Sequence, residues 1–218
     1  MDWQNLGPEL SQAAGQTVYM VLITLVAGGF FGLLIGLGLY LTRSGNLLAN
    51  RAVFTIINVL INLVRPVPFI IFLVALGPLT RIVTGRTIGI EAFTFAMCVM
   101  ASVVFARLVE QNLVTIDPGV VEAARAMGAS PLRIVRTVLI PEALAPLVLG
   151  YTFLFIVVLD MSAIGGYLGA GGLGDFAIVH GYQQYNWGVT FVVVVIIVAV
   201  VQLVQVLGNS LARRALRR

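Results

Sequence analysis

Long apolar stretches separated by short charged ones dominate the pattern of this chain. A bilayer core roughly 30 Å thick is crossed by a helix of about 20 mostly apolar residues. Five stretches are long enough, at about residues 17–40, 53–79, 92–113, 143–159 and 189–207. The pattern therefore predicts an all-α membrane protein with about five transmembrane helices, folded as a single transmembrane domain over residues 1–218.

The second stretch is interrupted by the sequence Arg-Pro-Val-Pro at residues 65–68. Proline lacks a backbone donor and disfavours helix in the residue before it, so a kink or a re-entry is expected there. Two arrangements are open. One is a single tilted and kinked span, and the other is an interfacial helix at residues 52–64 followed by a shorter crossing.

Composition excludes several classes of protein. Hydrophobic residues make up 60% of the chain and charged residues only 10%, whereas a soluble domain carries about 25% charged residues. A cytosolic enzyme is therefore not expected. All 13 basic residues are arginines, so the chain lacks the lysine of a phosphate-binding loop and cannot itself be an ordinary P-loop ATPase.

The arginines also predict the orientation in the membrane, because basic residues near span ends are retained in the cytoplasm. With the N-terminus outside and the C-terminus cytoplasmic, Arg81 and Arg86 lie outside and Arg65 is ambiguous. The ten arginines then placed in the cytoplasm are Arg43, Arg51, Arg107, Arg125, Arg133, Arg136, Arg213, Arg214, Arg217 and Arg218.

Small and polar positions recur inside the spans. Gly28, Gly32 and Gly36 repeat every fourth residue and form a stripe where another helix can approach closely. Packing within the chain is the favoured interpretation, and a dimer contact is the other. Asn58 and Asn62 share a helix face, where they either hydrogen-bond across helices or line a path. Arg107 and Glu110 are spaced to pair on one helix.

Residues 117–141 form a charged segment between the third and fourth apolar stretches, too polar to cross the bilayer cheaply. Asp117-Pro118 is typical of a helix cap followed by proline at the first helical position, and Gly128 is typical of a helix end. Ser130-Pro131 repeats the cap and the proline. We therefore expect two short helices, the second ending near Leu139 before Pro141.

Each of these two helices has an apolar side that must be buried. The first combines small and flexible apolar groups with a charged edge of Glu122 and Arg125, and the second has a stripe of Leu132, Val135 and Leu139. Two destinations are open, namely the ends of the chain's own spans or a groove on a partner protein. The apolar surface of the first helix comprises Val120, Ala123, Ala124 and Met127.

The segment carries a motif. Residues 122–131, Glu-Ala-Ala-Arg-Ala-Met-Gly-Ala-Ser-Pro, continuing to Leu139-Ile140-Pro141, resemble the E-A-A, then G, then I-x-L-P cytoplasmic loop of bacterial ABC-importer permeases. In that family this loop is the coupling helix that inserts into the ATP-hydrolysing subunit. The resemblance thus favours docking on a partner, and it implies that Glu122, Ala123, Ala124 and Gly128 are the coupling residues.

The resemblance extends over nearly the whole chain. Arg-Pro-Val-Pro-Phe-Ile at residues 65–70, Arg107 with Glu110 and Asn112, and Gly-Ala-Gly-Gly-Leu-Gly at residues 169–174 are similar to the methionine-importer permease subfamily. The implied fold is that of a type I ABC importer permease. The implied partners are a second permease chain in a homodimer, two copies of an ABC ATPase subunit that bind ATP and Mg, and an extracytoplasmic substrate-binding lipoprotein. The implied location is the bacterial plasma (inner) membrane, in contact with membrane lipid and not with nucleic acid.

The sequence departs from the subfamily at residues 159–166, Leu-Asp-Met-Ser-Ala-Ile-Gly-Gly, where relatives more often carry Gly-Tyr instead of Leu159-Asp160 and Met instead of Ile164. Ile164 stands where relatives have an apolar constriction and is the candidate gate. Asp160 is either a solvated helix end or a residue that attracts a substrate amino group. The candidate gate or path residues are Asp160, Met161, Ser162, Ile164, Asn58 and Asn62.

Two motifs do not point to a ligand. Gly169, Gly171 and Gly174 match the dinucleotide pattern G-x-G-x-x-G, but neither a preceding strand nor a later acidic residue accompanies them. The resemblance places this glycine-rich stretch in the external loop. Close backbone approach, contact with a delivery protein and a flexible connector all remain open for it. His180 is the only histidine, and with one distant Asp175 it provides too few ligands for a metal.

These observations indicate a transport protein whose energy is supplied by another protein. Ion-driven transporters bury ionisable groups at the midplane. Apart from Asp160 and Arg65 these spans have none there, since Arg107 and Glu110 are expected near the cytoplasmic end of the third span. We expect a non-enzymatic permease subunit of an ATP-driven importer for methionine, with no cofactor of its own. The alternatives are a permease for another amino acid or an osmolyte, and a membrane scaffold or channel whose loop recruits an unrelated cytoplasmic protein.

Overall fold

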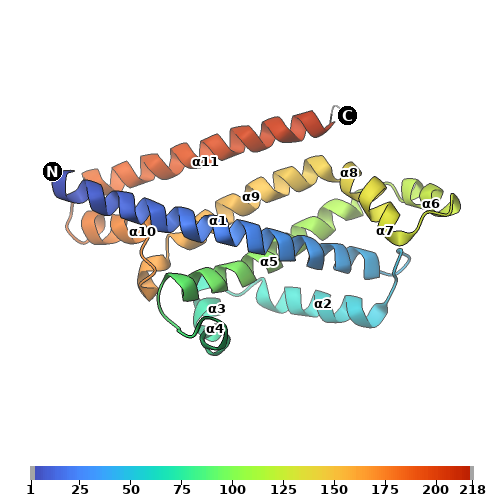
Figure 1. Ribbon diagram of the computed structural model, residues 1–218, viewed down its shortest axis with the longest axis horizontal. Helices are drawn as coiled ribbons and strands as arrows, with labels where there is room; N and C mark the ends of the chain where they lie inside the picture. Colours follow the sequence, from blue (N-terminus) through green and yellow to red (C-terminus); the bar gives the residue numbers. More distant parts are fainter. Residues whose placement is uncertain (1–2, 217–218) are drawn as a thin grey trace.

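Helices dominate the part of the chain that the computed structural model describes, residues 3–216, and no strand occurs within it. Arg217 and Arg218, which the orientation argument counted as cytoplasmic, lie outside the described residues. Four helices are long and apolar enough to cross a membrane. They are α1 (Trp3–Thr42), α5 (Ile90–Val114), α9 (Leu144–Ser162) and α11 (Trp187–Leu216), and they run along the long axis of the molecule (Figure 1).

The second predicted stretch is broken into α2 (Arg51–Val64), α3 (Phe69–Ala75) and α4 (Gly77–Thr84). The break predicted at residues 65–68 is confirmed, and α3 is turned by 113° from α2. The bent pair α2 and α3 is either one broken span or a re-entrant segment. The choice between the two predicted arrangements therefore stays open, with α3 and α4 only seven and eight residues long.

Packing of α1 against α5 forms the centre of the bundle. A Cβ added at Gly28 would lie 2.7 Å from the Cβ of Ala101, and one at Gly32 would lie 2.8 Å from the Cβ of Phe105. Such distances are shorter than real Cβ contacts. The stripe of glycines therefore serves packing within the chain, as predicted, and brings the two backbones together.

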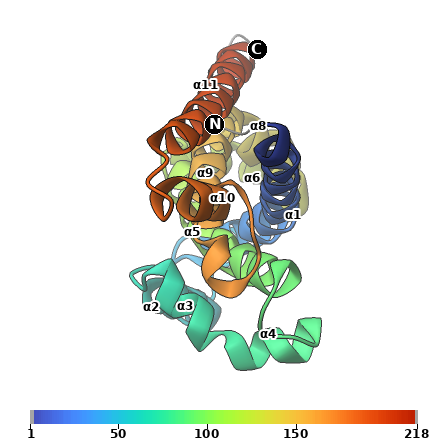
Figure 2. The ribbon, with the colours of Figure 1, turned by 90° about the vertical axis from the view of Figure 1, so that its left-hand side faces the viewer.

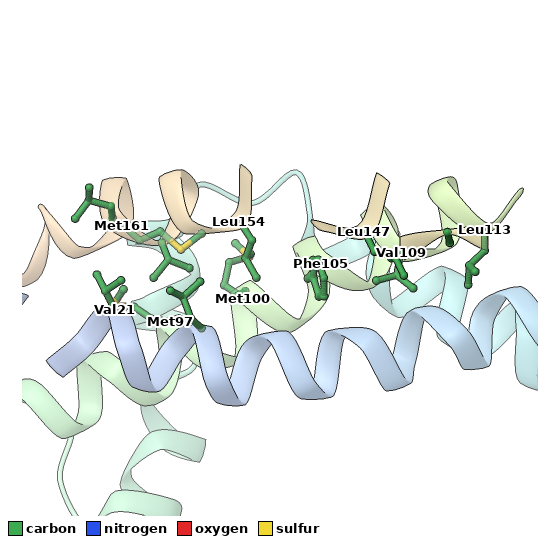
Figure 3. Packing of buried hydrophobic residues seen from close by; sticks show 14 of the residues in the cluster. Val21, Met97, Met100, Phe105, Val109, Leu113, Leu147, Leu154 and Met161 are labelled. Carbon is green, nitrogen blue, oxygen red and sulfur yellow. The ribbon is translucent and has the colours of Figure 1, made fainter. Parts of the chain in front are cut away.

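The buried core lies where α5 is covered by α1 and α9. Figure 3 shows Met97, Met100, Phe105 and Val109 of α5 directed toward side chains of α1 and α9. Most of the outer surface is apolar as well, above all on α11, where only Val189, Val193, Gly208 and Ala212 are buried. In Figure 2, α11 lies at one edge of the bundle and α2 to α4 lie at the opposite edge. Apolar outer faces of this kind suit a bilayer environment.

Short helices gather at both ends of the bundle (Figure 1). At one end are α6 (Pro118–Ala126), α7 (Pro131–Ile134), a π-helical turn (Val135–Leu139) and α8 (Ile140–Glu142). At the other end are a 3₁₀ turn (Gly165–Leu168), α10 (Leu173–Phe176) and a second π-helical turn (Ala177–Tyr182). The charged segment and the glycine-rich segment therefore lie on opposite sides of the predicted membrane. Which side is cytoplasmic stays a prediction.

Candidate functional site

Helix α6 is built by local capping, as the sequence predicts. The Asp117 side chain accepts a hydrogen bond from the Gly119 amide at 2.8 Å, and Pro118 occupies the first turn. At the other end Gly128 has a left-handed backbone with φ of +79°. Its amide donates to the Arg125 carbonyl at 2.9 Å and that of Ala129 donates to the Ala124 carbonyl at 3.2 Å, the paired bonds of a Schellman motif.

One face of α6 is buried and the other is open. Val121 and Ala124 are buried in the main core cluster, whereas Met127 is 81% exposed. We name the exposed set, which has small or flexible apolar groups around one carboxylate, the α6 knob. It consists of Val120, Glu122, Ala123, Ala126 and Met127.

The four predicted coupling residues therefore differ in exposure. Glu122, Ala123 and Gly128 are exposed, but Ala124 faces inward with 5% of its surface exposed. Ala124 is not part of the exposed surface of α6, because α6 uses it together with Val121 to pack on the bundle; its role in coupling stays a prediction. Its small side chain lies in the main core cluster and helps to hold α6 against the bundle.

The segment after α6 differs from the predicted second helix. Ser130 provides no side-chain cap, and Leu132 is 58% exposed although it was predicted on the buried stripe. Leu139 is buried as predicted and Val135 is half-buried, whereas Ile134, outside the predicted stripe, is buried in place of Leu132. The π-helical turn that follows Ile134 changes the helical register, which simple 3.6-residue counting does not include. The helical structure continues through Pro141 in α8, whereas the second helix was predicted to end near Leu139.

A crevice of about 230 Å³ separates α6 from the turn that joins α1 to α2. Its α6 side is formed by Pro118, Val121, Glu122 and Arg125, and its other side by residues 43–46. Glu122 and Arg125 make no ion pair within residues 3–216. The α6 knob thus presents an acid without an ion pair beside exposed apolar groups, and Arg125, also without an ion pair within the described residues, lies next to it. This arrangement suits insertion into a groove on another protein.

The candidate path residues at and just after the end of α9 are not all exposed. Asp160 is exposed and Ile164 is half-buried, but Met161 and Ser162 are buried at 7% and 2% exposure. The Ser162 hydroxyl donates to the Leu159 carbonyl at 2.6 Å, so it is satisfied within its own helix. In this conformation Met161 and Ser162 belong to the core, and a path-lining role for Asp160 and Ile164 stays a prediction.

Asn58 and Asn62 join helices, which is the first of their two predicted roles. Arg107 of α5 donates from Nη2 to Oδ1 of Asn58 at 2.9 Å and also to Oδ1 of Asn62. Its Nη1 lies 3.2 Å from Glu110, so the predicted pair is confirmed. The sequence did not indicate Arg43, whose Nη1 contacts the other Glu110 oxygen at 3.5 Å. The only signal in the sequence for this contact would have been a basic residue that directly follows one span and an acidic residue within another.

The glycine-rich segment is docked on α1 rather than forming a loose connector. The Gly172 amide donates to Oε1 of Gln16 at 2.9 Å, and the Leu173 amide donates to Oγ1 of Thr17 at 2.8 Å. Gly171 and Gly172 have positive φ angles of 68° and 99°. Close backbone approach, one of the three predicted explanations, is therefore confirmed, and contact with a delivery protein stays a prediction.

A further polar contact at this end links the lone histidine to α1. Nε2 of His180 lies 3.0 Å from Glu9, and its ring stacks on Phe176 with centroids 4.8 Å apart. No group of three or more His, Cys, Asp or Glu side chains that could hold a metal occurs in the described part of the chain. The histidine thus acts in packing between α1 and the second π-helical turn.

Comparison with known proteins identifies relatives for this arrangement. The family described as binding-protein-dependent transport system inner membrane component matches residues 28–217. The probable D-methionine transport system permease protein MetI of Vibrio cholerae serotype O1 is 37% identical over 213 residues, which are 97% of this chain and 95% of the relative. The methionine import system permease protein MetP of Bacillus subtilis is 40% identical over 171 residues, 78% of this chain and 77% of the relative.

Solved structures share the fold. A structure of inward-facing conformations of the MetNI methionine ABC transporter matches with a TM-score of 0.90 at 40% identity, covering 94% of this chain and 95% of that chain. An amino acid ABC transporter with histidines matches with a TM-score of 0.79 at 22% identity, covering 98% and 99%. The second likeness is one of fold alone.

Proposed function

The chain belongs to the family of binding-protein-dependent transport system inner membrane components, and from this membership we propose that it is the membrane-spanning permease subunit of an ATP-driven methionine importer. It has the fold of a type I ABC importer permease and resides in the bacterial inner membrane. Substrate transport is its task, and the energy comes from a partner ATPase.

The stoichiometry of the proposed transporter follows from the presence of one α6 knob in each permease chain. Two permease chains form a homodimer with the path between them, and two ATPase subunits that bind ATP and Mg each engage one α6 knob. A substrate-binding lipoprotein delivers the substrate on the other side. The N-terminus is external and the C-terminus cytoplasmic, as the distribution of arginines favours.

The observation that carries the proposal is the placement of α6. It lies in the chain between α5 and α9, two long helices of the core, and Val121 and Ala124 tie it to that core. The Schellman motif at Gly128 keeps it compact. A displacement of α6 by the ATPase is therefore passed to α5 and α9 together, which favours one of two bundle arrangements over the other.

Coupling is tested by removing the acid of the α6 knob. In proteoliposomes that contain the whole transporter, Glu122→Ala is expected to lower ATP-driven uptake at least tenfold and to weaken co-purification of the ATPase. Glu91→Ala is the matched control, because Glu91 is exposed and pairs only with exposed Arg86, and such surface pairs contribute little. Unchanged uptake by Glu122→Ala, with the ATPase retained, would exclude α6 as the coupling element.

The substrate is tested separately. In cells that carry the whole system, unlabelled methionine is expected to suppress uptake of labelled methionine, whereas amino acids without a thioether are expected to compete weakly. If unlabelled methionine does not compete, the substrate assignment is wrong although the ATPase coupling can still hold.

A further inference from the structure

A wide cleft lies beside the α1–α2 turn and shares Arg43 and Ser44 with the crevice next to α6. It encloses about 850 Å³ between the end of α1, the start of α2 and the side of α5. Three arginines line it, Arg43, Arg51 and Arg107, together with the single carboxylate of Glu110. We name it the arginine cleft.

The charges in the arginine cleft do not balance. Glu110 is only 8% exposed, and its two oxygens are taken by Arg43 and Arg107 at 3.5 and 3.2 Å. Arg107 also donates hydrogen bonds to the side chains of Asn58 and Asn62. Arg51 is exposed and makes no ion pair within residues 3–216, and Arg43 is 47% exposed with one long contact. Three guanidinium groups against one carboxylate leave two positive charges for an anion.

The arginines rather than the helix end are the available donors. The start of α2 contributes the positive end of its dipole, but its Ala52 and Val53 amides already donate to the Asn50 side chain, both at 3.1 Å. An anion in the arginine cleft would thus be held by Arg51 and Arg43. Guanidinium groups bind phosphate oxygens in paired geometry.

The position of the arginine cleft indicates a lipid. It begins where α1 ends at Thr42 and α2 starts at Arg51, the level at which an apolar span passes into the headgroup layer. From there α2 presents exposed apolar side chains along its length, among them Ile56, Val59 and Leu63. A phosphate joined to acyl chains would use both surfaces, whereas a free anion would use only the arginines.

We propose that the arginine cleft binds the headgroup of an anionic phospholipid, with its acyl chains lying on the exposed apolar face of α2. The lipid phosphate neutralises Arg43 and Arg51 and stabilises the α1–α2 turn. The Arg107–Glu110 contacts behind it stay intact. This role is independent of which substrate the transporter carries.

Native mass spectrometry of the transporter with its ATPase tests the proposal, with phosphatidylglycerol and phosphatidylcholine as the two probes. The wild type is expected to retain phosphatidylglycerol in preference, and Arg51→Gln is expected to lower that affinity about fivefold. Arg81→Gln is the matched control, since Arg81 is an exposed arginine of α4 away from the arginine cleft, and it should leave the preference unchanged.

Three outcomes would overturn the proposal. One is equal retention of the two lipids by the wild type, and another is an equal loss in Arg51→Gln and Arg81→Gln, which would show only general attraction to a basic surface. The third is complete displacement of phosphatidylglycerol by inorganic phosphate, which would show an anion site with no contribution from α2. Arg51 is an exposed residue at the start of α2, so its replacement is not expected to impair folding.

Discussion

Gly36 is where the packing of α1 against α5 can be tested most sharply. A Cβ at this position would lie 2.5 Å from the Ala106 carbonyl oxygen and 2.6 Å from the Cβ of Val109. Both neighbours are fully buried at 0% exposure, and both atoms are rigid. Gly36→Ala therefore has no flexible side chain to displace, and the two helices must separate.

The magnitude follows from that separation. Ordinary contact begins at 3.4 Å, so the carbonyl must move by about 0.9 Å, and overpacking of this kind costs about 1–3 kcal/mol. Alanine regains up to about 1 kcal/mol through its better helix propensity. The net loss of about 0–2 kcal/mol corresponds to a Tm lower by up to about 8 °C for a chain of this size.

Gly38 is the internal control, two residues further along α1. A Cβ there meets only Cδ1 of Ile57, at 3.9 Å, which is ordinary contact. Gly38→Ala is expected to leave the Tm unchanged or raise it slightly. The assay is size-exclusion chromatography of detergent-purified protein after heating at one fixed rate, since membrane proteins often unfold irreversibly. A Gly36→Ala variant as stable as Gly38→Ala would refute the close packing of α1 on α5.

Three further perturbations probe the polar contacts. Glu110→Gln leaves two arginines without their carboxylate and should destabilise by about 3 kcal/mol; an unchanged Tm would contradict the network. Thr17→Val removes the acceptor of the Leu173 amide, which costs about 1–3 kcal/mol, so hydrogen exchange at residues 172–176 should accelerate while α5 stays protected. Tyr151→Phe loses the 2.9 Å bond to the Leu25 carbonyl and should lower stability by about 0.5–1.5 kcal/mol; a stabilised variant would argue against that bond.

The features predicted correctly from the sequence depend on neighbours in the chain. Helices of 19 to 40 residues appear where apolar runs predicted them, because a long apolar run has to be buried in lipid or protein. Both ends of α6 follow from Asp117 and Gly128, whose hydrogen bonds reach residues at most a few positions away. Capping is local chemistry, and so it can be inferred without the fold.

Other features were decided only when distant segments met. Arg43 and Glu110 are 67 residues apart, and the bonds from Gly172 and Leu173 to α1 span 156 residues, so no local pattern indicates them. Ala124 is buried and Leu132 exposed because the packed bundle sets the rotation of α6 and of the π-helical turn after it. The sequence by itself thus determined which segments are helical and where α6 begins and ends. The tertiary structure decided which face each helix buries, since that choice depends on the shape of the neighbouring surface.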